Sequence, residues 1–138
     1  MYNKNIVKVA IPLLSISFFS FILWVIYLAN TGQNSMFFRF IAAIPYGDKL
    51  GHFCLFGGLT LLANFALRLK VVKLGSLSLY WGTILVSAFV IIEEASQYFI
   101  PNRNFDLIDL TADFIGIGFF TLCTAVIQKQ LLLAKSNA

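Results

Sequence analysis

Charged side chains are scarce in this sequence. Only 12% of its 138 residues are Asp, Glu, Lys or Arg, while 59% are hydrophobic. Water-soluble domains carry about 25% charged residues, so this composition argues against a soluble fold. We expect an integral membrane protein whose apolar surface faces the lipid bilayer. The chain length fits a single domain that covers residues 1–138.

Cysteines and clustered basic residues are also lacking. The two cysteines, Cys54 and Cys123, lie inside apolar stretches and have no metal-type spacing to the single histidine, His52. Thiols in such surroundings usually behave as small hydrophobes, so no thiol chemistry is predicted. The ten basic residues are scattered along the chain and form no dense patch, which argues against nucleic acid as a partner.

Long apolar stretches are what the sequence does have. A membrane-spanning helix needs roughly 20 mostly apolar residues, because about 30 Å of hydrocarbon is crossed at a rise of 1.5 Å per residue. Four stretches approach this length and predict helices at about 9–29, 50–67, 74–92 and 110–127. The expected fold class is an all-α membrane protein, a four-transmembrane-helix bundle that lies in the cell membrane as a multi-pass protein.

Basic residues are divided unequally between the two ends of the predicted helices. One end holds three of them, Arg39, Lys49 and Arg103. The other end holds seven: Lys4, Lys8, Arg68, Lys70, Lys73, Lys129 and Lys135. The positive-inside rule therefore predicts that both termini are cytoplasmic and that all six acidic residues lie at the outer end.

The acidic residues form a second pattern. Five of the six fall within Glu93–Asp113, and the sixth, Asp48, precedes His52 by one helical turn. Capping explains part of this, because Asp48 and Asp106 stand where helices begin and Asp109 completes a capping-box spacing. Ionisable groups in a membrane cost on the order of 2.5–3.5 kcal/mol at a helix centre, so they usually face partners and indicate function. The acids also outnumber the cations beside them, which predicts a need for protons, a metal or a ligand.

These polar residues are expected to meet in one outward-facing pocket. His52, Glu94 and Asp109 share one depth if the helices alternate in direction, and Arg103 is tethered six residues before Asp109. The simpler alternative is an interhelical network that only pins the bundle, with His52 bonded to an acid and Arg103 bridging two others. The predicted ligand-binding residues are Asp48, Lys49, His52, Glu94, Gln97, Arg103, Asp106, Asp109 and Asp113.

The order of the motifs "DKLGH", "EEASQ", "PNR" and "DLIDLTADFIG" resembles the VanZ-like family of small bacterial membrane proteins. The resemblance covers about half of the chain, from Asp48 to Gly118. Asp113 departs from the family pattern, in which asparagine is expected at this position in many members. The resemblance implies the fold, the site and a link to glycopeptide (teicoplanin-type) antibiotic resistance. The residues that match the family motifs are Asp48, Lys49, His52, Glu94, Gln97, Arg103, Asp106, Asp109 and Gly116.

Three functions stay open, and the first is favoured. In it, the protein binds or modulates a cell-envelope component. Two helix N-termini together with Lys49 and Arg103 hold the phosphate or carboxylate of a lipid head group or cell-wall precursor. The expected partners are the lipid bilayer and such a lipid-linked or anionic ligand, and a homo-oligomer is left open.

The second function is a membrane-embedded hydrolase or transferase. His52, oriented by Asp48, would act as general base or acid, and Glu94 is the other catalytic candidate. A metal-assisted variant would use His52, Glu94 and Asp109 as ligands. No tight metal-ligand motif is present, so neither a metal nor another cofactor is assigned.

The third function is a proton-coupled small transporter. Asp113 is its best argument, because it lies deepest in a predicted span. Against it, the inner halves of the helices carry few polar groups: Asn64, Thr83 and Thr121 are too sparse for a pathway.

Overall fold

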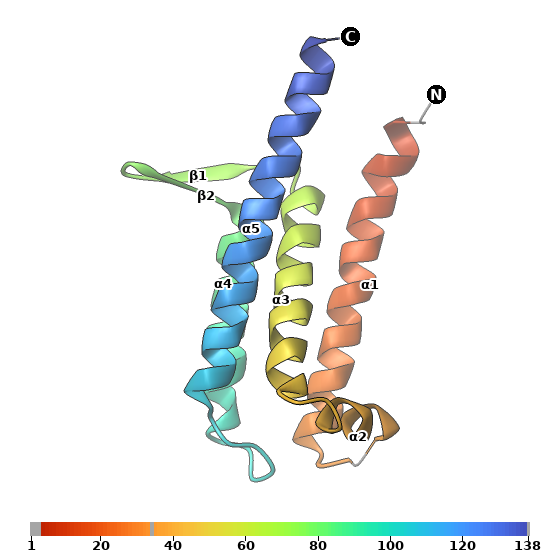
Figure 1. The fold of residues 1–138 in the computed structure, drawn as a ribbon, viewed down its shortest axis with the longest axis vertical. Helices are drawn as coiled ribbons and strands as arrows, with labels where there is room; N and C mark the ends of the chain where they lie inside the picture. The colour runs from red at the N-terminus through yellow and green to blue at the C-terminus, as the bar shows by residue number, and fades with distance from the viewer. Residues whose placement is uncertain (1–3, 34, 138) are drawn as a thin grey trace.

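Four long helices run along the long axis of the molecule in the computed structural model, which describes residues 4–33 and 35–137 (Figure 1). A short helix, α2, follows the first long helix, and a two-stranded hairpin separates the second from the third. In chain order the elements are α1 (Lys4–Asn30), α2 (Met36–Ala42), α3 (Gly47–Ala66), β1 (Val71–Leu74), β2 (Leu77–Tyr80), α4 (Trp81–Gln97) and α5 (Leu107–Ser136).

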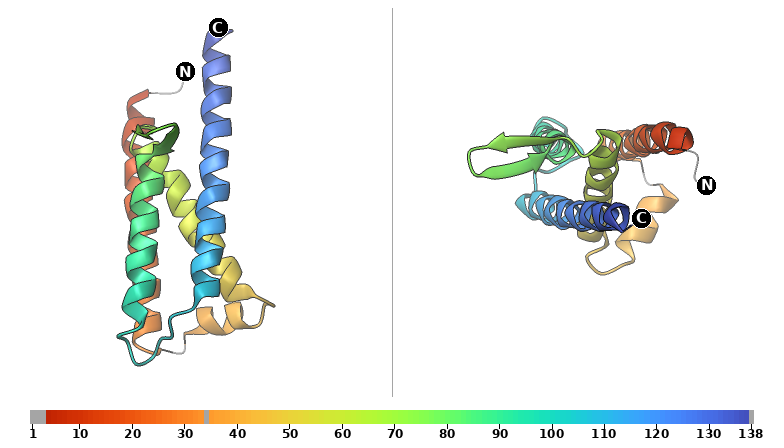
Figure 2. Two further views of the ribbon diagram at one scale, coloured as in Figure 1. Left: turned by 90° about the vertical axis from the view of Figure 1, so that its left-hand side faces the viewer. Right: turned by 90° about the horizontal axis from the view of Figure 1, so that it is seen from above.

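The central helix is α3, which packs against α1, α4 and α5 and makes its largest contact with α5 (Figure 2). This contact is close because of Gly116: a methyl group there would lie 2.3 Å from the backbone oxygen of Phe53. Gly57 is similarly confined, by the ring of Phe120. The buried apolar core draws on all four long helices and comprises Ile22, Phe56, Leu59, Val86, Val90 and Ile117.

Two helices, α1 and α5, are long and apolar enough to cross a membrane, over Lys8–Asn30 and Leu107–Ser136. Only 6% of the most apolar part of α1 is buried, and 22% of that of α5. The core helix of a soluble protein would be mostly buried, so these helices keep their apolar side chains on the surface. Helix α4 has 17 residues, so at a rise of 1.5 Å per residue it is roughly 26 Å long. This length is less than the thickness of about 30 Å of the hydrocarbon core of a bilayer.

The third predicted helix, 74–92, is wrong at its start. Val71–Leu74 and Leu77–Tyr80 pair as antiparallel strands instead, with Gly75 at the turn in the left-handed region (φ 65°). Glycine adopts this conformation without the steric penalty of a Cβ, so it permits a turn inside an apolar stretch. The all-α fold class is corrected accordingly: the chain is mostly helical with one hairpin, and α4 runs from Trp81 to Gln97.

The other three predicted helices are present with different bounds. The first begins at Lys4 instead of residue 9, and the second is shifted to Gly47–Ala66. The last continues nine residues past its predicted end, to Ser136. This extension is rich in Gln, Leu, Lys and Ala, which are strong helix formers, and contains neither Gly nor Pro.

The two ends of the molecule differ in content. Both chain termini lie at one end, with the β1–β2 hairpin nearer to it than to the other, whereas α2 and the connection from α4 to α5 lie at the opposite end (Figure 1). We call the opposite end the charged end, and define it by the nine predicted ligand-binding residues together with Glu93.

Candidate functional site

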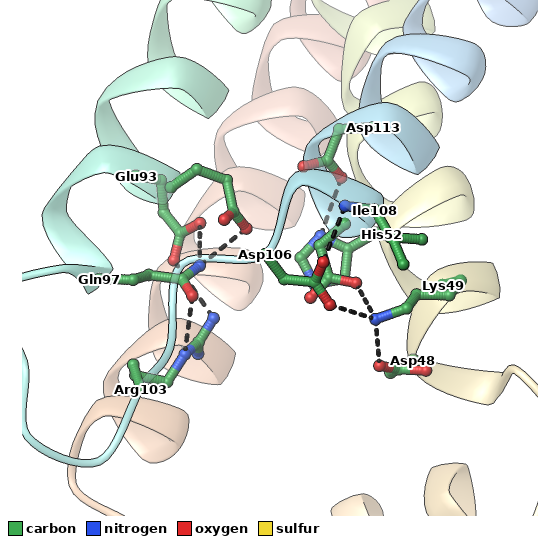
Figure 3. A network of polar contacts seen from close by, with 11 residues as sticks. Asp48, Lys49, His52, Glu93, Gln97, Arg103, Asp106, Ile108 and Asp113 are labelled. Carbon is green, nitrogen blue, oxygen red and sulfur yellow. Dashed lines mark hydrogen bonds and ion pairs between the residues drawn. The ribbon is translucent and has the colours of Figure 1, made fainter.

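The polar side chains of the charged end run from the surface into the interior of the helix bundle (Figure 3). The exposed fraction of the side chain falls from 61% at Asp48 through 38% at Asp106 and 14% at Asp109 to zero at Asp113. The polar side chains of the site are therefore exposed to solvent at its outer part and buried toward the middle of the bundle.

Lys49 ties the start of α3 to the start of α5. Its Nζ lies 2.9 Å from Asp48 Oδ2 and 3.1 Å from Asp106 Oδ2, and it also donates to Asp109 Oδ1. Asp106 accepts from the backbone N–H of Ile108 at 2.8 Å. That N–H, and secondly Lys49, lower the pKa of the Asp106 carboxyl.

The capping predictions have mixed outcomes. Asp106 is the N-cap of α5, as predicted. Asp109 turns its carboxylate toward Lys49 instead of back to the cap, because the cation lies within reach. Asp48 does not cap α3: Tyr46 holds that position, with φ 56° and no side-chain cap bond, and Asp48 lies in the first turn.

His52 is held by α5. Its Nδ1 lies 2.9 Å from Asp113 Oδ1, and its Nε2 faces Asp109 Oδ2 at 3.9 Å. Asp48 was the predicted orienting residue, and this is wrong, because Asp48 is exposed and bonded to Lys49 while Asp113 is buried across the α3–α5 contact. With Asp113 ionised, Nδ1–H donates to it and Nε2 is left as an acceptor.

A second group of contacts surrounds Gln97 on α4. Gln97 Nε2 donates to Glu93 Oε2 at 3.0 Å and to Glu94 Oε1 at 2.8 Å. Arg103 donates through Nε to Gln97 Oε1 at 3.3 Å and pairs with Glu93 Oε1 at 3.7 Å. Glu93 is absent from the predicted ligand-binding residues. Its spacing of four from Gln97, which puts both on one helix face, is the signal that would have found it.

Three of the four residues expected to converge come together. One ligand atom each of His52, Glu94 and Asp109 lies within 4.8 Å of the others. Arg103 does not join them, because Gln97 and Glu93 hold it on the α4 side of the site. Figure 3 shows this division, with Arg103 beside Gln97 and Lys49 beside Asp48 and Asp106.

A cavity of about 110 Å³ lies beside the site, between α1, α2 and α3. Its wall is mostly apolar, and its charged or ionisable members are Asp48, His52, Glu93 and Arg103. The apolar members, with Gly51, are Ile22, Val25, Ile26, Ala29, Phe38, Ile41, Leu55 and Phe56.

Two carboxylate oxygens of the site lack a hydrogen-bond partner within the described residues, Glu94 Oε2 and Asp113 Oδ2. Both side chains are fully buried. An ionised oxygen without a partner is costly in such a place, so these two atoms require a proton or a cation.

A separate set of buried polar residues lies nearer the chain termini. Asn64 Nδ2 donates to Thr83 Oγ1 at 3.2 Å and to Thr124 Oγ1 at 3.3 Å, and Asn64 Oδ1 accepts from the backbone N–H of Thr83 at 2.9 Å. Thr83 also bonds Thr121 at 2.8 Å. We call these four residues the amide–hydroxyl network. They satisfy one another and link α3, α4 and α5.

Comparison with known proteins gives no match: no family model, no curated protein and no solved structure is significantly similar to this chain. The resemblance to a family thus stays a prediction that rests on the motif residues.

Proposed function

We propose that the chain is a multi-pass membrane protein that binds the polar head of an amphiphilic cell-envelope component at its charged end. The observation that carries the proposal is the cavity, whose lining is mostly apolar and includes His52 and Arg103 among its four charged or ionisable residues. Ligand sites commonly combine an apolar wall with a few placed polar groups. In the proposed complex the hydrocarbon chain of the ligand contacts the apolar residues and its polar head contacts the charged ones.

Arg103 is the group best placed to hold an anionic head. Lys49 already contacts three carboxylates, whereas Arg103 contacts Gln97 through Nε and Glu93 through Nη2. A guanidinium has five N–H donors in a planar fork, so it binds phosphate or carboxylate with two parallel bonds. The ligand class that follows is a lipid-linked phosphate or carboxylate.

The proposal includes four membrane spans with both termini in the cytoplasm. Support comes from the placement of both termini at the end opposite the acids (Figure 1) and from the unequal division of basic residues. Reporter fusions at Ala138 test this topology. A cytoplasmic reporter should be active there, whereas an active alkaline phosphatase fusion would place the charged end on the cytoplasmic side.

Retention of lipid tests the binding proposal. Native mass spectrometry of the detergent-purified protein should show a bound phosphate-bearing or carboxylate-bearing lipid. Arg103→Gln should lose that ligand, whereas Arg39→Gln should retain it, because Arg39 is exposed on α2 and does not line the cavity. No ligand on the wild type, or equal retention by both variants, would contradict the proposal.

The resemblance to the VanZ-like family supplies a cellular readout. Expression of the wild type in a susceptible bacterium should raise tolerance to teicoplanin, and expression of Arg103→Gln should not. Unchanged tolerance with the wild type would separate this chain from that role without affecting the lipid measurement.

A membrane hydrolase or transferase is the second candidate, favoured by the 2.9 Å contact between His52 Nδ1 and Asp113 Oδ1. A carboxylate on Nδ1 orients imidazole so that Nε2 can accept a proton as a general base. In that case the mass of the retained lipid should change with incubation of the wild type and stay constant with His52→Gln. Constant mass in both proteins would leave binding as the function.

A further inference from the structure

We propose that His52, Glu94 and Asp109 form a binding site for one divalent transition-metal ion of the zinc class. The three residues come from α3, α4 and α5, and their ligand atoms lie within 4.8 Å of one another. His52 Nε2 and Asp109 Oδ2 are 3.9 Å apart. Two ligands that each lie about 2.1 Å from a tetrahedral ion are roughly 3.4 Å apart, so a small shift of the side chains completes the geometry.

Glu94 is prepared for a cation. It is fully buried, and Gln97 Nε2 holds its Oε1 at 2.8 Å. Its Oε2 has no hydrogen-bond partner among the described residues. A buried carboxylate with one oxygen fixed and the other unpaired matches a metal ligand better than a structural hydrogen bond, because a structural role would satisfy both oxygens.

His52 has the arrangement that histidine ligands adopt. Metal-bound imidazoles almost always donate their other ring N–H to a carboxylate or carbonyl, which fixes the tautomer and the ring plane. Asp113 Oδ1 occupies this position at 2.9 Å from Nδ1. Nε2 is therefore the coordinating atom, and Asp113 is a positioning residue.

The charge balance of the site favours a cation. All six acidic side chains of the chain lie at the charged end, and the basic side chains at that end are Lys49, Arg103 and, on α2, Arg39. Three negative charges are left over if every acid is ionised and His52 is neutral. A divalent ion bound by Glu94 and Asp109 would balance two of them.

The donor set selects the kind of ion. One imidazole nitrogen and two carboxylate oxygens suit Zn²⁺ and its first-row neighbours, whereas Mg²⁺ and Ca²⁺ prefer oxygen alone. Three protein ligands leave a fourth position open on a zinc ion. His52 lines the cavity and Glu94 and Asp109 do not, so the ion would lie beside the place where the head of the proposed ligand is expected.

The test is zinc binding by the untagged full-length protein in detergent, after removal of metals with a chelator. Titration against a chromophoric zinc indicator should give one ion per chain, and Mg²⁺ in excess should not displace it. Glu94→Gln and His52→Gln should each lose stoichiometric binding. The control is Asn104→Ala, which changes an exposed residue in the connection between α4 and α5 that is not one of the nine predicted ligand-binding residues, and it should bind zinc like the wild type.

Two further measurements keep the result decisive. Co²⁺ in place of zinc should give intense d–d absorption in the wild type and not in His52→Gln, which would show a four-coordinate site that depends on the imidazole. Asp113→Asn should keep the stoichiometry and weaken zinc affinity about tenfold, the usual effect of changing the hydrogen-bond partner of a metal-bound histidine. Size-exclusion profiles that match the wild type show that the variants are folded.

Absence of stoichiometric zinc on the wild type would overturn the proposal, and so would equal binding by Glu94→Gln, His52→Gln and the wild type. The buried acids would then be protonated. Because zinc is measured without any lipid, and lipid retention is measured through Arg103, failure of one proposal is distinguishable from failure of the other.

Discussion

The charged end and the amide–hydroxyl network are two polar clusters that join α3, α4 and α5, and they differ in how far their buried groups are satisfied. In the network, Asn64 uses its oxygen and its nitrogen in bonds to Thr83 and Thr124. At the charged end, Glu94 and Asp113 each keep one buried oxygen without a partner among the described residues. Burial of polar residues therefore does not by itself indicate function here; unmatched charge does.

The two clusters should also differ in what they contribute to stability. Neutral hydrogen bonds are worth roughly 0.5–1.5 kcal/mol each when formed, and a buried group that loses its partner costs about 1–3 kcal/mol. A buried charge without a partner lowers the stability of a fold, so its removal can stabilise the protein. The network should thus hold the helices together, whereas the charged end is maintained at a cost that a ligand or ion offsets.

The largest effect is expected where the two clusters are joined, at Gly116. Gly116→Val places side-chain atoms against the backbone of Phe53 and forces α3 from α5, which should destabilise the fold by about 3 kcal/mol and disturb both clusters. Gly118→Val is the matched control, because a Cβ there meets nothing within 4 Å among the described residues. Thermal unfolding in detergent measures both. Equal melting temperatures would show that the α3–α5 contact is not as close as described.

The next largest effect is expected at Asn64, whose substitution should change stability without changing zinc binding. Asn64→Ala removes four hydrogen bonds and leaves the backbone N–H of Thr83 without its acceptor, so the free energy of unfolding should fall by about 2 kcal/mol. Zinc stoichiometry of the folded protein should not change. Asn104→Ala, at an exposed position, serves as the control. A loss of zinc binding with Asn64→Ala would make the network part of the site.

A smaller effect of opposite sign is expected at Glu94. Glu94→Gln keeps the size of the side chain and removes the cost of burying the carboxyl group, whether ionised or protonated, so the metal-free protein should become about 1 kcal/mol more stable. The variant should also lose the zinc-dependent rise in melting temperature shown by the wild type. A destabilised metal-free variant would assign Glu94 a structural role like that of Asn64.

The smallest effect concerns pH at Asp106. The N–H of Ile108 and the Lys49 ammonium lower its pKa in the folded state. Its contribution to stability is thus complete above the unfolded pKa of about 3.9, and it is lost as the pH falls through the lower folded value. Melting temperatures of the wild type and Asp106→Asn should differ slightly at pH 7 and converge in acid. A difference that is constant with pH would show that charge at Asp106 has no role.

Apolar runs were sufficient to predict where the long helices lie, because length and hydrophobicity are local properties of the sequence. The hairpin was missed because Val71–Leu74 and Leu77–Tyr80 are as apolar as the helix that follows, and only Gly75 and Ser76 separate them. The convergence of His52, Glu94 and Asp109 followed from depth along alternating helices. The carboxylate that bonds His52 could not be predicted from depth alone. Asp48 and Asp113 both lie near the depth of His52, and only the packing of α5 selects Asp113.

The close contact at Gly57 and Gly116 and the amide–hydroxyl network lie between the site and the end that holds the termini. A ligand or ion that enters at the charged end would leave by the same route. A charge that crosses a membrane gains or loses about 2.3 kcal/mol per 100 mV, but one that returns to its starting side does no net electrical work. In the proposed membrane topology, the site is therefore filled from one compartment alone, and its occupancy should follow the concentration of its ligand there, which is the behaviour of a receptor.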